Sequence, residues 1–189
     1  MRWDLLFGDL ESQAVALQSV ARDAEVDERT RTELGRIRLV ERLVPAVGRS
    51  IRVGGRGLVV SGTLTRVGAE WLLIDEVAGR QALVALAAIS DIGGLDRHAA
   101  AADSLGPVGS RLGLAHVLRG IARDRSGVQV ELTDGRKVHG TIDRVGLDFF
   151  ELAVHDVGVA RRSSEVREVV VIALAGLAVV RRDGGDRPR

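Results

Sequence analysis

Few side chains in this sequence are spaced for catalysis or metal binding. The four histidines stand far apart, at His98, His116, His139 and His155. A metal site needs three or four converging ligands, and no two histidines here have the spacing of such a site. There is no cysteine, which excludes disulfides and thiolate metal sites. The G-x-S-x-G and H-E-x-x-H motifs are also absent, so we predict no catalytic residue, no metal and no cofactor.

Arginine is the other residue type that could do chemistry, because its guanidinium binds phosphate through two parallel hydrogen bonds. The candidate nucleic-acid contacts are Arg66, Arg144, Arg161, Arg162, Arg181 and Arg182. The net charge is only +1, so no overall field attracts nucleic acid. High-GC coding, which favours arginine, alanine, glycine and valine together, is an alternative explanation for the many arginines.

The elements that must position these residues are short β-strands. Apolar side chains alternate at Val128, Val130 and Leu132, which is the spacing of a half-buried strand. Asp134-Gly135 follows and predicts a hairpin turn, because both residue types tolerate positive φ. In the strands beyond such turns, a glycine predicts curvature or the close approach of a neighbouring backbone.

The same pattern occurs twice in the chain. Residues 60–74 (VSGTLTRVGAEWLLI) match residues 138–152 (VHGTIDRVGLDFFEL) at a shift of 78 positions, and the mid-strand glycines are Gly62 and Gly140. A helix is expected before each copy, at 34–47 and 112–124. An internal repeat of this length predicts two similar units in tandem, each a helix followed by about five short strands.

These motifs resemble the Sm-like (LSm) fold, which is one of the SH3-like small barrels. The resemblance rests on a helix, V-x-V-x-L-x-D-G, h-x-G-x-h, a glycine-marked turn and a closing apolar hairpin, and it covers residues 35–95 and 112–181. It implies a mostly β fold with two tandem five-stranded Sm-like barrels, each preceded by a helix. We expect the two repeats to pack against each other through their edge strands, because exposed edges favour aggregation. The whole chain also resembles proteins of high-GC Gram-positive bacteria, some labelled Fis-type regulators, although its C-terminus predicts a strand and no helix-turn-helix.

The Sm-like resemblance implies ring assembly through edge-strand pairing and binding of uridine-rich RNA. The family binds RNA with an Asp-x-x-x-Asn turn and an Arg-Gly pair. The matching positions are 68–72 and 146–150 for the first motif and 85–89 and 173–177 for the second. They contain no asparagine and no Arg-Gly, so this chain departs from the usual RNA pocket. Trp71 and Phe149 could stack on bases instead, or pack between the two barrels.

The predicted organisation has five parts. They are an N-terminal helix or coiled coil at 1–33, a first barrel at 34–95, a linker at 96–111, a second barrel at 112–181 and a disordered tail at 182–189. The N-terminal helix is predicted to be long, and its helical pattern continues to residue 47. Its apolar seam includes the candidate partner-binding residues Trp3, Phe7, Leu10 and Leu17. Self-pairing, binding of a partner and folding back onto the barrels all fit this seam.

The longest apolar run, residues 169–180, has 12 residues and is too short to span a bilayer. Its valines favour a buried strand pair, and with no visible leader we predict a cytoplasmic protein without a membrane partner. The predicted function is a non-enzymatic binding or adaptor protein. Its partner is RNA or a protein, with self-association through the N-terminal helix or the barrel edges. The alternatives are a structural or regulatory scaffold that dimerises through its N-terminal helix and a DNA-associated transcription regulator.

Overall fold

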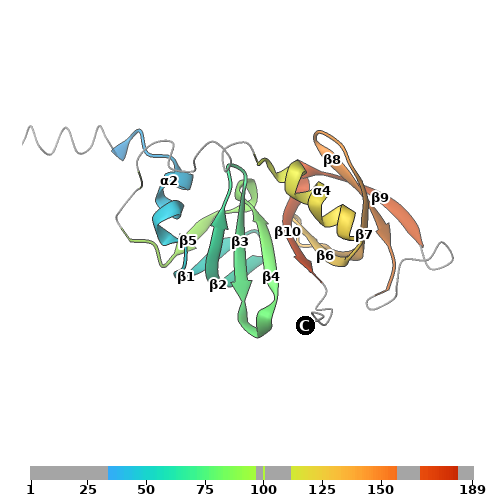
Figure 1. Cartoon of the computed structure of the whole chain (residues 1–189), viewed down its shortest axis with the longest axis horizontal. Coiled ribbons are helices and arrows are strands. Elements are labelled where there is room, and N and C mark those ends of the chain that lie inside the picture. Colours follow the sequence, from blue (N-terminus) through green and yellow to red (C-terminus); the bar gives the residue numbers. More distant parts are fainter. Residues whose placement is uncertain (1–33, 97–99, 101–111, 157–166, 183–189) are drawn as a thin grey trace, which may run out of the picture. The chain divides into compact units, whose positions relative to one another are not determined.

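The structure is a computed structural model that describes residues 34–96, 100, 112–156 and 167–182 (Figure 1). Its contacts divide the chain after Arg38, and Leu39–Arg189 forms one compact unit. The predicted N-terminal seam with Trp3, Phe7, Leu10 and Leu17 lies outside the described residues. So do Arg161 and Arg162, most of the predicted linker and residues 183–189 of the predicted tail.

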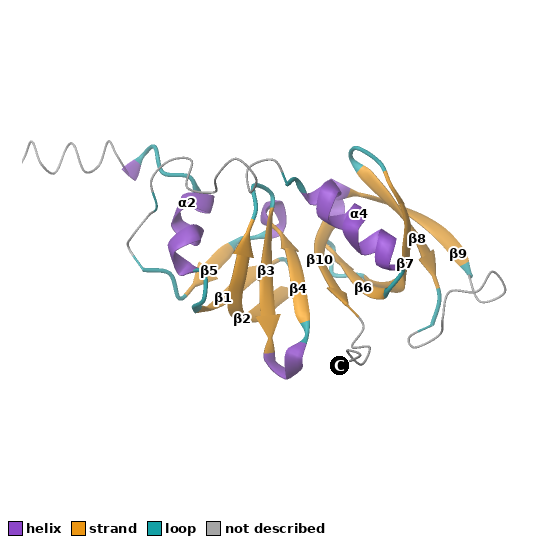
Figure 2. Cartoon of the chain, in the orientation of Figure 1, coloured by secondary structure: helices purple, strands orange, loops and turns teal. Residues whose placement is uncertain are grey.

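The described residues form one antiparallel sheet of ten strands in the order β5-β1-β2-β3-β4-β10-β6-β7-β8-β9 (Figure 2). The strands of the first half are β1 (Ser50–Gly55), β2 (Leu58–Val67), β3 (Trp71–Glu76), β4 (Gln81–Ala85) and β5 (Asp91–Gly93). Those of the second half are β6 (Gly127–Leu132), β7 (Lys137–Val145), β8 (Phe149–Val154), β9 (Glu168–Ala173) and β10 (Leu177–Arg182). In both halves the fifth strand lies beside the first, and the second, third and fourth strands follow in order.

The prediction of two separate five-stranded barrels is wrong. Strand β4 of the first half pairs with β10, the last strand of the second half, with Leu83 opposite Val180 and Val84 opposite Val179. This pairing satisfies backbone N–H and C=O groups that two isolated sheets would leave at their edges. The alternation of apolar residues predicts which face of a strand is buried, but it does not identify the neighbouring strand. The two halves meet at edge strands, as expected, but the pattern does not identify β4 and β10 as the strands that pair.

The prediction of a long helix that continues to residue 47 is also wrong for residues 34–47, which are the part of that helix that the structure describes. Residues 35–38 form a turn and irregular chain, and only α2 (Leu39–Leu43) and the short 3-10 helix η1 (Val44–Ala46) follow. Gly35 is a poor helix former, and Pro45 has no N–H to continue the helical hydrogen bonds. The part of this prediction before residue 34 lies outside the described residues.

The second predicted helix is confirmed as α4 (Leu114–Asp124), within two residues of the expected start. Its buried residues Leu114 and Leu118 are one turn apart, so they lie on the same face of the helix. The helix ends at Arg125, whose φ of 48° is the left-handed conformation that commonly follows a helix C-terminus. Three further 3-10 turns connect strands: η2 (Val77–Gly79), η3 (Leu86–Ala88) and η4 (Leu174–Gly176).

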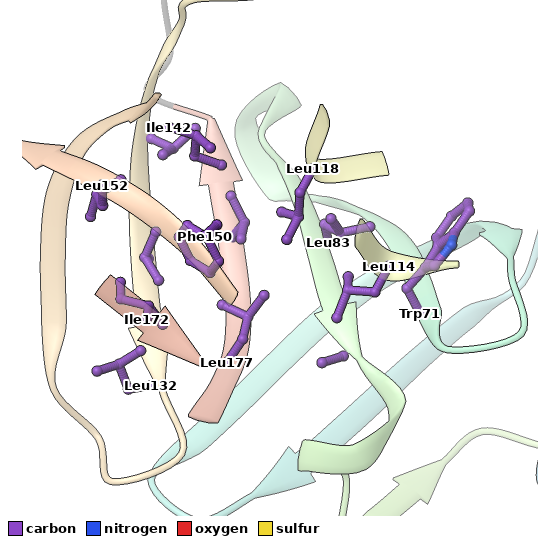
Figure 3. Packing of buried hydrophobic residues seen from close by; sticks show 14 residues of the cluster. Trp71, Leu83, Leu114, Leu118, Leu132, Ile142, Phe150, Leu152, Ile172 and Leu177 are labelled. Carbon is purple, nitrogen blue, oxygen red and sulfur yellow. The ribbon is translucent and has the colours of Figure 1, made fainter. Parts of the chain in front are cut away.

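Strands β4 and β10 contribute side chains to two hydrophobic cores. Leu83 and Val180 belong to the core that α4 shares with the second half (Figure 3). Their chain neighbours Val84 and Val179 belong to the core of the first half. Successive side chains of a strand point to opposite faces, so one pair of strands can form a wall of both cores. The two halves therefore bury apolar surface that neither could bury without the other.

The two halves also bend at matching places. The register shifts between Leu64 and Arg66 where β2 pairs with β3, and between Ile142 and Arg144 where β7 pairs with β8. Such shifts mark β-bulges, which bend a strand and increase its twist. The bend lets each long second strand contribute to the curvature of its own half.

Two glycines beside these bends are required by close backbone contacts. A Cβ atom on Gly62 would lie 2.2 Å from the carbonyl oxygen of Asp75, and one on Gly140 would lie 2.3 Å from that of Ala153. No side chain fits at such distances without a backbone shift. The predicted close approach at the mid-strand glycines is therefore confirmed.

We expect Gly140→Ala to lower the free energy of unfolding by about 1–3 kcal/mol, because its methyl group would push β8 away from β7. Gly176→Ala is the matched control, since a Cβ there meets no atom within 4 Å and its φ is not positive. The control should be neutral or stabilising by up to about 1 kcal/mol. Urea denaturation of both variants measures the difference, and equal stabilities would contradict the close-contact explanation.

Candidate interaction surface

Arg181 joins the two halves through a nearly buried group of three charges. Its Nη1 donates to a carboxylate oxygen of Glu131 at 2.9 Å, and its Nε donates to one of Glu76 at 3.0 Å. The three side chains are between 5% and 13% exposed. Glu76 ends β3 and Glu131 lies on β6, so this arginine of β10 connects a strand of each half.

The electrostatic balance around Arg181 favours its charged form. Burial by itself lowers the pKa of the guanidinium. The hydrogen bonds and negative charge of Glu76, followed by those of Glu131, outweigh that effect and raise the pKa above its ordinary value. Arg181 therefore keeps its charge and serves as a structural cation, which leaves little of it for binding phosphate.

A polar pocket of about 500 Å³ adjoins this group of charges. It is lined by Gly57, Val59, Glu76, Arg80, Gln129, Glu131, Lys137 and Arg181. Lys137 lies 3.8 Å from Glu131, so Lys137 and Arg181 are both paired with carboxylates of the lining, and Arg80 adds a third cation. We assign the pocket to the structural junction between the two halves.

The other candidate nucleic-acid arginines are dispersed over the described surface. Arg182 pairs with Asp124 at the end of α4, and Arg144 pairs with Glu151 at 2.7 Å. Arg66 is exposed on β2. The structure thus brings no two of the described candidates into a common phosphate-binding cluster.

One histidine lies inside the second half. His155 Nε2 and the hydroxyl of Thr141 are 2.9 Å apart, and His155 Nδ1 is 2.9 Å from the carbonyl oxygen of Asp156. Both side chains are buried, so a substrate has no access to them. Each of these polar atoms has a hydrogen-bond partner within the protein, so we assign the pair a structural role in the core.

Helix α4 is attached to the first half at the beginning of β3. The carboxylate of Glu70 accepts the N–H of Leu114 at 2.8 Å, and Trp71 Nε1 donates to the carbonyl of Leu112 at 2.7 Å. The buried side chains of α4 lie beside Trp71 and Leu83 (Figure 3). A carboxylate and an aromatic ring thus dock the helix N-terminus.

The equivalent residues of the second half are uncovered. Phe149 is 37% exposed, whereas its counterpart Trp71 is 7% exposed. Val171 on β9 is 63% exposed, whereas its counterpart Leu83 on β4 is 4% exposed. We define the β9 surface as Leu147, Asp148, Phe149, Val169 and Val171, all of them exposed. It lies on β8, β9 and the turn before them (Figure 1).

Phe149, Val169 and Val171 share a face of the sheet, and Leu147 and Asp148 lie in the bend just before Phe149. Phe149 lies opposite Ala173, and Glu151 lies opposite Val171, in the antiparallel pair of β8 and β9. Directly opposite residues point to the same side, and residues two apart on one strand do so too. The exposed ring and the exposed valines therefore adjoin a strand that, among the described residues, has a neighbour on one side only.

Sequence reasoning identified Phe149 and missed the rest of this surface. The valine-rich run at 169–180 was predicted to be a buried strand pair, which is right for β10 and wrong for Val169 and Val171. A position-by-position comparison of the two repeats is the sequence signal that points to this surface, because Val171 occupies the position of Leu83, which is buried.

The comparison with protein-family models and the comparison with curated proteins yield no match to this chain. The Sm-like and Fis-type resemblances therefore stay predictions. Within the described ranges, no group of three or more histidine, aspartate or glutamate residues is placed to hold a metal ion. A helix with the length and apolar character of a membrane span is not found among the described residues.

We expect Arg181→Met to lower the free energy of unfolding by about 3–5 kcal/mol at neutral pH, because it leaves two nearly buried carboxylates without their shared arginine and only Glu131 then has a cation nearby, the more distant Lys137. Arg144→Met is the matched control. Its ion pair is mostly solvated, with Arg144 79% exposed, and should contribute less than about 1 kcal/mol. Equal losses in the two variants, measured by urea denaturation, would contradict the structural role of Arg181.

Glu70→Ala should destabilise the chain by about 1–2 kcal/mol, because the N–H of Leu114 loses its charged acceptor. Asp148→Ala, at the equivalent position of the second half, should change the stability of dilute protein by less than about 0.5 kcal/mol, as is usual for exposed sites. Thermal and urea unfolding of both variants test this asymmetry between the repeats. A similar loss in both would show that Asp148 already has a partner within the chain.

Proposed function

We propose that this chain is a non-enzymatic, cytoplasmic protein-binding scaffold that binds its partner by adding a strand to the edge of β9 that has no neighbouring strand in the described ranges. The observation that supports the proposal is the exposure of Val171 and Phe149 beside β9, which has one neighbouring strand in the described part of the chain. In strand addition, backbone hydrogen bonds provide affinity, and side-chain contacts provide specificity.

The backbone of β9 has the hydrogen-bonding groups that strand addition requires. Leu174 N–H donates to the carbonyl of Asp148 at 2.7 Å, across the pair of β8 and β9. In an antiparallel pair, alternate residues point their backbone groups at the neighbouring strand. Ile172 and Val170 therefore bond to β8, and Val171 and Val169 point their N–H and C=O groups to the open edge.

The side chains at this edge favour a protein partner. Exposed edge strands are usually protected by lysine, proline or a covering element. In β9 the only charged residue is Glu168, at its first position, and exposed valines follow it. Apolar side chains together with open backbone groups suit an added β-strand. RNA recognition requires cationic groups, which are absent from β9 itself.

A photo-crosslinking amino acid at position 171 of the full chain, expressed in its native cells, tests the proposal. The matched control has the same residue at Val59, a 60% exposed valine of β2. We expect a cross-link to a polypeptide at 171 and not at 59, and slower hydrogen exchange of the Val169 and Val171 amides when that polypeptide is added to the purified chain. Cross-links to RNA, to the same molecule's own residues or at both positions equally would contradict the proposal.

A further inference from the structure

We propose that the polar pocket between the two halves binds a small oxyanion, either a phosphate ester or a polycarboxylate, between Arg80 and Lys137. The inference is separate from the β9 surface, because none of the described lining residues lies on β8 or β9. The pocket has a volume of about 500 Å³, which is in the range of small-molecule sites. Val59 is the single hydrophobic residue of the described lining, so the pocket suits a charged ligand better than an apolar one.

The most buried charges of the pocket are already paired with each other. Both carboxylate oxygens of Glu76 accept from Arg181, at 3.0 and 3.3 Å, and Glu131 Oε2 accepts from the same guanidinium at 2.9 Å. These three side chains are nearly buried, and their ion pairs connect strands of the two halves. The two carboxylates therefore hold Arg181 in its structural role, and a ligand must bind to other groups of the lining.

Two exposed cations of the lining have such groups. Arg80 makes no ion pair and no side-chain hydrogen bond within the described ranges. The ammonium of Lys137 lies 3.8 Å from Glu131, which is close enough for an ion pair but beyond hydrogen-bonding distance. A guanidinium has five N–H donors and an ammonium has three. An oxyanion in the pocket would therefore accept hydrogen bonds that no described residue accepts.

The charges of the lining favour an anion over a cation. Three cations, Arg80, Lys137 and Arg181, line the pocket with two carboxylates, Glu76 and Glu131, which leaves a net charge of +1. The two charged residues of the lining that are exposed are both positive. Guanidinium and ammonium groups bind phosphate and carboxylate oxygens. The described lining has no aromatic ring on which a nucleobase could stack, so the anionic group itself provides the recognition.

Each half of the chain contributes one of the two cations. Arg80 comes directly before β4, and its carbonyl accepts the N–H of Glu76 at 2.8 Å, which holds its backbone beside the buried ion pairs. Lys137 begins β7 of the second half. The hairpin turns of the two halves also meet at the pocket, because a Cβ atom on Gly57 would lie 3.7 Å from the Cα of Gly135. An anion between the two cations would thus bridge the halves.

A comparison of the two repeats shows that Lys137 is not part of their common pattern. Lys137 lies opposite Glu131 in the pair of β6 and β7, and the equivalent pair of β1 and β2 places Val59 opposite Gly54. The first half therefore has no charge at either position. Because Glu131 already binds Arg181, it does not require a second cation, and the ammonium of Lys137 is available to a ligand.

Lys137 is the only lysine of the sequence, which allows a test on the wild-type chain. The purified full chain is treated with an acetylating ester, with and without pyrophosphate or citrate, and acetylation is followed by mass spectrometry. We expect an anion that binds to slow the acetylation of Lys137 by about tenfold when it is present at ten times its Kd, and to leave the α-amine of the chain unaffected.

The two anions distinguish the two sources of the oxyanion. Protection by pyrophosphate alone assigns the site to phosphate groups, and protection by citrate alone assigns it to polycarboxylates. Protection by both supports a site for oxyanions of either kind. Protection by neither, or equal slowing at Lys137 and the α-amine, would overturn the proposal.

Calorimetric titration of variants with the protecting anion tests its partners. Arg80→Ala and Lys137→Ala should each raise the Kd by about tenfold or more, because each removes a charge-assisted hydrogen bond, and Lys137→Arg should keep most of the affinity. Arg136→Ala is the matched control, since Arg136 adjoins Lys137 in the chain, pairs with Asp134 and is not among the described lining residues. Equal losses in Arg136→Ala and Lys137→Ala would mean attraction by general surface charge and would overturn the site.

Amide NMR shifts of the wild-type chain keep the test decisive if a variant fails to fold. The amides of Gly57, Arg80 and Gln129 should shift during the titration, and those of Val169 and Val171 should not. Shifts confined to β9 would overturn the inference. A chain that binds a polypeptide at β9 but no oxyanion would refute the anion site and leave the proposed scaffold function standing, and the opposite result would do the reverse.

Discussion

The pairing of β4 with β10 is the constraint on which the rest of the structure depends. Each of these strands alternates between two cores, so Val84 and Val179 face one core while Leu83 and Val180 face the other. Removing β10 would open both cores and leave two strands, β4 and β6, without their neighbour. The two sequence repeats are therefore parts of one cooperative unit, which agrees with the single compact unit formed by Leu39–Arg189.

Arg181 gives this pairing its specificity. A buried ion pair adds little net stability, because the loss of hydration offsets much of the attraction. A slip of β10 by one residue, however, would exchange the faces of Val179 and Val180 and move Arg181 away from both carboxylates. The ion pairs and the apolar alternation thus select the same register.

The sequence predicts the local features of this protein well. The hairpin turn at Asp134-Gly135, helix α4 and the close approach at Gly62 and Gly140 follow from residue types and short spacings. The identity of the two strands that connect the halves does not, because a buried strand of the first half and a buried strand of the second have the same pattern whether they pair with each other or not. The exposure of Val171 was hidden for the same reason, since a valine-rich strand at an edge resembles one in the middle of a sheet.

The candidate site was predictable only through the repeat. Phe149 was identified because it occupies the place of Trp71, but the two residues were expected to behave alike. Their different exposure arises because α4 follows the first half, and no second helix of this kind follows the second half among the described residues. Candidate arginines such as Arg181 were chosen by residue type alone. Type does not show that a cation is already held by two carboxylates.

The pairing of β4 with β10 also has a consequence for the synthesis of the chain. Strand β4 ends at residue 85, but its neighbour β10 begins at residue 177. At about 5–20 residues per second, the ribosome needs roughly 5–20 seconds to make the intervening segment. During that time the first half has an open edge where Leu83 lacks its cover. The nascent chain is therefore most exposed to misassembly with neighbouring nascent copies, and slow release of β10 from the ribosome prolongs this period.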